Sequence, residues 1–166
     1  MKILSAAILI ASVPVTSANA QLGKDASYFC ISEFAGGVAY DQATKKWKGT
    51  ALRTNNKFVL RLKFVNSRVE KTFFRGDEIV HDYNITFTET GSNSPEPCID
   101  VRQSKPRITV GYDGLMTCTS SLDLNEYIFN LTKNRFLATY LIGYIDGKDS
   151  NENTPAVSGG ICAKID

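Results

Sequence analysis

The stretch KFVLRLKF, residues 57–64, places a large apolar side chain at every second position and basic side chains at most of the others. A period of two is typical of a β-strand with one buried and one solvated face. The same alternation recurs in HDYNITFT, residues 81–88. FLATYLI, residues 136–142, forms a third strand candidate that is apolar on both sides. These three stretches predict a predominantly β-structure.

Shorter strands and the turns between them complete this pattern. Further strands are expected at residues 28–34, 38–40, 47–52, 69–74, 108–111, 115–119 and 157–163. Short breaks of the hairpin kind are expected at Gly36-Gly37, Asn55-Asn56, Asn66-Ser67, Gly76-Asp77, Asp113-Gly114 and Lys133-Asn134. Residues 89–97 and 146–155 are rich in polar residues, glycine and proline, and predict two longer loops.

Residues 121–131 fit two conformations. A helix would align Leu124 with Ile128 and Leu131, whereas a strand would turn Tyr127 and Phe129 inward together with Leu131. The tight break that follows, and the strand after it, favour the strand as one arm of a hairpin.

The first twenty residues have the pattern of a secretory signal. Lys2 gives a positive start, residues 3–15 form a short apolar run, and Ala18-Asn19-Ala20 offers small residues where a signal peptidase cleaves. We therefore expect residues 1–20 to be removed and residues 21–166 to form one periplasmic or secreted domain. The apolar run is too short to span a bilayer, which needs about 20 residues, and we expect no transmembrane segment.

Four cysteines in an exported chain indicate disulfides, and they allow three pairings. We expect Cys30–Cys162 and Cys98–Cys118, because the terminal strands of closed sheets often lie side by side. A zinc site is the alternative. It lacks support, because the chain has no C-x-x-C motif and His81 is its single histidine. We therefore expect no metal.

Many short strands with mostly short connections predict an antiparallel up-and-down β-barrel of eight to ten strands, lipocalin-like in build. A bridge between the first and last strands would help to close it, and closure removes exposed strand edges. A two-sheet β-sandwich is the alternative architecture.

No motif in the chain requires a particular chemistry. The chain has 19 Lys and Arg and 17 Asp and Glu, a balance that argues against a nucleic-acid partner. His81 has the context of a strand residue near a rim, and neither a G-x-S-x-G elbow nor a phosphate-binding glycine loop occurs. The pattern predicts a protein without enzymatic activity, without catalytic residues and without a cofactor.

Several short segments resemble a group of exported proteins. These segments are GGVAYD at residues 36–41, WKGT at 47–50, Arg135-Phe136, Gly143-Tyr144, and Thr154-Pro155 ahead of Gly160-Ile161-Cys162. Together they resemble small exported proteins of Gram-negative bacteria that have no assigned function, so the resemblance implies no activity and no site residues. The similarity to lipocalins is one of architecture alone, because Trp47 precedes Gly49 and the Gly-x-Trp of lipocalins is absent.

The aromatic residues carry the functional prediction. Seven of them can converge inside a closed sheet: Phe58, Phe64, Tyr83, Phe87, Phe129, Phe136 and Tyr140. They predict a monomeric barrel that buries a small apolar or amphipathic ligand, with selectivity from the loops at 89–97 and 146–155. Alternatively they fill the interior. The protein would then be an interaction module, such as an inhibitor or an envelope-associated factor, that binds a protein partner through exposed loops and through the basic face of Lys57, Arg61 and Lys63.

Overall fold

The computed structural model describes residues 22–73, 76–101, 106–120 and 124–166, and the predicted signal peptide lies outside them. The described elements are β1 (Ala26–Asp41), β2 (Lys46–Ala51), β3 (Lys57–Thr72), β4 (Gly76–Glu89), β5 (Glu96–Ile99), β6 (Arg107–Val110), β7 (Leu115–Ser120), β8 (Glu126–Asn130), β9 (Arg135–Tyr140), α1 (Ile142–Ile145) and β10 (Ala156–Lys164).

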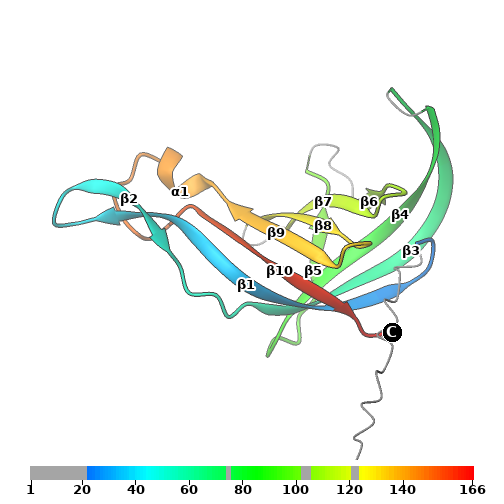
Figure 1. Cartoon of the computed structure of the whole chain (residues 1–166), viewed down its shortest axis with the longest axis horizontal. Coiled ribbons are helices and arrows are strands. Elements are labelled where there is room, and N and C mark those ends of the chain that lie inside the picture. Colours follow the sequence, from blue (N-terminus) through cyan, green and yellow to red (C-terminus); the bar gives the residue numbers. More distant parts are fainter. Residues whose placement is uncertain (1–21, 74–75, 102–105, 121–123) are drawn as a thin grey trace, which may run out of the picture.

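These strands form one antiparallel sheet that is hydrogen-bonded in a ring (Figure 1). The ring runs β1-β3-β4-β5-β7-β8-β9-β10, and β10 pairs back with β1. β6 pairs with β4. β2 and β3 pair with the same edge of β1, β3 with its first half and β2 with its second half. The predicted all-β antiparallel class is confirmed, and the described strands do not separate into two sheets.

Two of the predicted breaks are wrong, and a third is present but is not a hairpin. Gly36-Gly37 lies inside β1, Asn66-Ser67 lies inside β3, and Asn55-Asn56 joins two strands that both pair with β1 instead of with each other. At Gly37 the glycine serves a close approach, since a Cβ there would lie 2.2 Å from the carbonyl oxygen of Pro155. In β3 the register shifts between Phe64 and Asn66, so the strand bends at a bulge without ending.

The chain between β9 and β10 also differs from expectation. The predicted strand at residues 136–142 ends at Tyr140, and Ile142 begins the single helical turn α1. A Cβ at Gly143 would lie 1.2 Å from the carbonyl oxygen of Asn153, so this turn packs directly on the following loop. The predicted loop at 146–155 is confirmed. The predicted loop at 89–97 is shorter than expected, because Glu89 belongs to β4 and its last two residues belong to β5. The strand interpretation of 121–131 is confirmed over β8, and residues 121–123 lie outside the described part.

Both predicted disulfides are present, and each crosses a seam of the ring. Cys30 and Cys162 are direct partners where β1 meets β10, with a Cα–Cα distance of 4.0 Å. Cys98 and Cys118 join β5 to β7, where the ladder contains only two residue pairs among the described residues. The bridges are consistent with an oxidising extracytoplasmic compartment. Within the described residues, no helix is long and apolar enough to cross a membrane.

One end of the ring is filled by side chains. Leu60, Ile85, Ile108 and Val110 are at most 2% exposed. The segment before β1 closes this end, because the backbone N–H of Gly23 donates to the Tyr83 hydroxyl oxygen at 2.7 Å. Burial raises the pKa of the Tyr83 phenol above its usual value. The interior is therefore a packed core at this end.

The loop at 146–155 fastens the far end of β1 and β2. The Asn151 side chain accepts a hydrogen bond from the Tyr40 N–H at 2.6 Å and donates one to the Tyr40 carbonyl at 2.9 Å. The Trp47 indole N–H donates to Asp149 at 3.0 Å, and its ring packs edge-on against Tyr144. This loop therefore braces the strands instead of lining the interior.

Candidate ligand-binding pocket

The other end of the ring is hollow. A pocket of about 560 Å³ lies between the walls formed by β1, β3, β4, β5, β8, β9 and β10, with the segment at 52–56 at its rim. Pockets for small organic molecules typically measure about 300–1,000 Å³. The described part of the interior therefore divides into a packed end and an open end.

A group of aromatic rings forms the apolar wall of this pocket. Phe58 packs against Phe87, Tyr127 and Phe136 with ring-centroid distances of 5.7, 6.0 and 5.2 Å. Phe87 and Tyr127 lie closer still, at 4.6 Å. Such edge-on and tilted contacts stabilise each ring in place. The wall is thus built before any ligand arrives.

A row of small residues explains why the pocket is open. In the strand register, Ala35 of β1 is opposite Ser158 of β10, and Ser158 is opposite Ala138 of β9. Ala138 is in turn opposite Tyr127 of β8. Short side chains on these three adjacent strands do not extend far toward the Phe58 and Phe87 rings of β3 and β4, so space remains between them.

Polar groups occur both in the pocket wall and at its mouth. Ser32 is 7% exposed, and its hydroxyl has no hydrogen-bond partner among the described residues. Glu96 is half-buried and accepts a hydrogen bond at 3.1 Å from the hydroxyl of Ser120, which is 1% exposed. Arg53, Lys57 and Glu89 are exposed at the mouth. The pocket is therefore amphipathic.

The structure divides the seven aromatic residues predicted to bind ligand. Phe58, Phe87, Phe136 and Tyr140 line the pocket. The other three do not line the pocket. Phe129 is fully buried behind the wall, and Phe64 and Tyr83 pack against each other at the closed end. An alternating pattern identifies the inward face of a strand, but not the depth at which a side chain lies.

Several lining residues had weaker signals in the sequence. Tyr127 lies on the inward face expected if residues 121–131 form a strand, and Ser32 follows Cys30 on the same face of β1. Glu96 falls in the predicted loop at 89–97, which does contribute to the pocket. The loop at 146–155 is not among the described lining residues, contrary to the expected role in selectivity.

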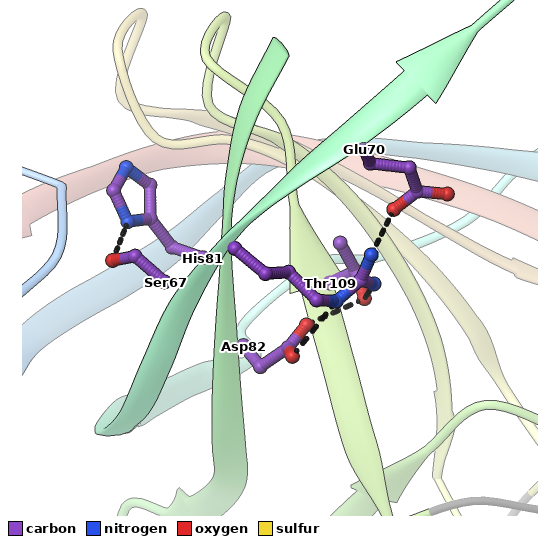
Figure 2. A network of polar contacts seen from close by, with 6 residues as sticks. Ser67, Glu70, His81, Asp82 and Thr109 are labelled. Atoms are coloured by element: carbon purple, nitrogen blue, oxygen red, sulfur yellow. Dashed lines mark hydrogen bonds and ion pairs between the residues drawn. The ribbon is translucent and has the colours of Figure 1, made fainter. Parts of the chain in front are cut away.

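His81 does not line the pocket, and it is the register partner of Ser67 in the long hairpin of β3 and β4. The tip of this hairpin extends beyond the ring (Figure 1). The Nδ1 of His81 is 2.8 Å from the Ser67 hydroxyl oxygen (Figure 2). The neighbouring carboxylate of Asp82 lies on the opposite face of β4, where Arg68 and Thr109 donate to it at 3.2 and 2.8 Å. Asp82 therefore cannot orient the imidazole as the third member of a catalytic triad.

The described residues contain no group of three or more His, Cys, Asp or Glu side chains placed to hold a metal ion. Comparison with known proteins adds no further assignment: no protein-family model, no curated protein and no solved structure matches this chain.

Proposed function

We propose that this protein is a non-enzymatic binding protein of the periplasm or the extracellular space, with a lipocalin-like barrel that holds one small amphipathic molecule. The observation that carries the proposal is the pocket of about 560 Å³ with an aromatic wall in an otherwise packed interior. The apolar part of the ligand would lie against Phe58, Phe87, Tyr127 and Phe136. Its polar part would meet the polar groups of the pocket, which occur in the wall and at the mouth. Burying apolar surface there contributes roughly 25 cal/mol per Å².

Filling the pocket tests this proposal. In Ala138→Trp the indole would occupy the space above the row of small residues, and we expect binding of the neutral fluorescent probe N-phenyl-1-naphthylamine to weaken at least about tenfold. Thr117→Trp is the matched control, because it adds the same ring to the exposed outer face of β7. Probe fluorescence measures binding, and circular dichroism verifies that both variants fold.

Undiminished probe binding by a folded Ala138→Trp variant would contradict the proposal. Because the larger side chain can strain the sheet, Ala35→Leu provides a second and gentler way to fill the same row. It should weaken binding in the same direction by a smaller factor.

A second candidate function rests on the outer face of the ring. Three apolar side chains form a row across four adjacent strands: Phe34 of β1, Leu137 of β9 and Ile128 of β8. Gly159 of β10 lies between Phe34 and Leu137. A Cβ at Gly159 would lie 2.5 Å from the Phe34 ring and 2.8 Å from Leu137, so both side chains lean over the glycine. All three are exposed, at 55, 43 and 40%. Contiguous exposed apolar patches mark interaction sites.

The partner we propose for this patch is a second copy of the chain, joined sheet to sheet. This candidate replaces the expected monomer with a dimer. Analytical ultracentrifugation over a range of concentrations would then show a dimer for the wild type and a monomer for Leu137→Glu. A wild-type protein that remains monomeric throughout would reject it.

A further inference from the structure

Glu96 is the least exposed charged residue among those that line the pocket. It lies on β5, directly opposite Phe87 of β4, and both side chains line the pocket. One carboxylate oxygen is held by the buried Ser120 hydroxyl. Among the described residues, none of the ion pairs includes Glu96. A half-buried carboxylate without a cationic partner favours a positive charge brought by a ligand.

The aromatic wall favours the same charge. The ring faces of Phe and Tyr carry negative electrostatic potential and attract ammonium groups within about 6 Å. Phe87 and Tyr127 form the closest ring pair of the wall, and Phe87 is the cross-strand partner of Glu96. A cation bound near the Glu96 carboxylate would therefore also lie close to the Phe87 and Tyr127 rings.

Ser32 supplies an independent observation on another wall. β3 and β4 separate its strand, β1, from β5 in the ring. Its hydroxyl is buried and has no hydrogen-bond partner among the described residues, although buried hydroxyls usually have one. A polar atom of a ligand can satisfy it.

Resting on the proposed function above, we infer that the ligand is a small organic cation: an amine or ammonium group on an apolar body. The charged nitrogen lies against the Glu96 carboxylate and the adjoining rings, and Ser32 forms a hydrogen bond with a second polar atom. Arg53 and Lys57 at the mouth are exposed and solvated, so salt screens their effect on a charge inside the pocket.

Three ligands with one alkyl chain test this assignment: octylamine, octanol and octanoate, each competed against N-phenyl-1-naphthylamine at pH 7. We expect octylamine to bind at least about tenfold more tightly than the other two. Glu96→Gln should lower octylamine affinity by about the same factor and leave octanol affinity unchanged. Glu33→Gln, which removes an exposed carboxylate of β1 that does not line the pocket, is the matched control and should change octylamine affinity less than about twofold.

Each outcome separates this inference from the function on which it rests. Equal binding of all three ligands would overturn the inference that the ligand is a cation, but the proposed binding function would stand. A preference for octanoate would overturn it in favour of Arg53 and Lys57. Failure of every ligand and of the probe would overturn both proposals. If Glu96→Gln unfolds, Ser120→Ala is the second variant, because it keeps the Glu96 carboxylate and removes the hydroxyl that holds it in place. It should lower octylamine affinity by a smaller factor and leave octanol affinity unchanged.

Discussion

Replacing Cys30 and Cys162 by alanine is expected to lower the free energy of unfolding by about 4 to 5 kcal/mol, the largest effect that the structure predicts. The bridge joins residues 132 positions apart, so breaking it releases a long loop in the unfolded chain. It also ties β1 to β10, the pairing that closes the ring. Alanine suits both positions because Cys30 and Cys162 are buried, and a serine hydroxyl there would need a partner.

The second bridge is the natural comparison. Cys98 and Cys118 are 20 positions apart, and the loop-closure relation assigns this bridge about 3 kcal/mol. Guanidinium chloride unfolding of the two double-alanine variants measures both losses. A larger loss from the Cys98–Cys118 pair would contradict the ranking. The two-residue ladder between β5 and β7 would then govern stability more than the length of the loop.

Phe58→Ala is expected to cost about 3–5 kcal/mol of unfolding free energy, because it removes a buried ring at the centre of the aromatic wall. Phe58 is 6% exposed and contacts Phe87, Tyr127, Phe129 and Phe136. Its loss would also enlarge the pocket, so the variant should bind bulkier amphiphiles better relative to N-phenyl-1-naphthylamine. Chemical denaturation and probe competition measure the two effects.

Phe34→Ala is the matched control, because Phe34 is 55% exposed on the outer face. Its expected cost is within about 0.5 kcal/mol, with probe binding unchanged. Similar losses from both variants would show that Phe58 is not held by the wall. A destabilised Phe58→Ala with wild-type ligand preference would place the ligand elsewhere.

Much of the fold was predictable because burial leaves a local record in the sequence. A strand with one face in a core needs an apolar residue at every second position, and KFVLRLKF at 57–64 retains this pattern in β3. The disulfide pairing was predictable from a global argument, since bridging the terminal strands helps to close a sheet. Both kinds of inference depend on constraints that many structures share.

Glycines show where local inference failed. Gly36-Gly37 has the composition of a turn, yet β1 continues through it because β2 and the chain near Pro155 approach closely there. A glycine required for a turn and a glycine required for a close contact are identical in sequence. The contacting atom of Pro155 lies more than a hundred positions away along the chain.

By itself, the sequence determined the β-class, the main strands and the aromatic inward faces, because each depends on residues close together in the chain. The tertiary structure alone decided which aromatic residues line a pocket. The open space depends on Ala35, Ser158 and Ala138 meeting in one row, which is a consequence of strand register. Glu96 and Ser32 likewise enter the same pocket only because the ring brings β5 and β1 around a common interior. Register and closure are properties of the whole sheet, and no short stretch of sequence encodes them.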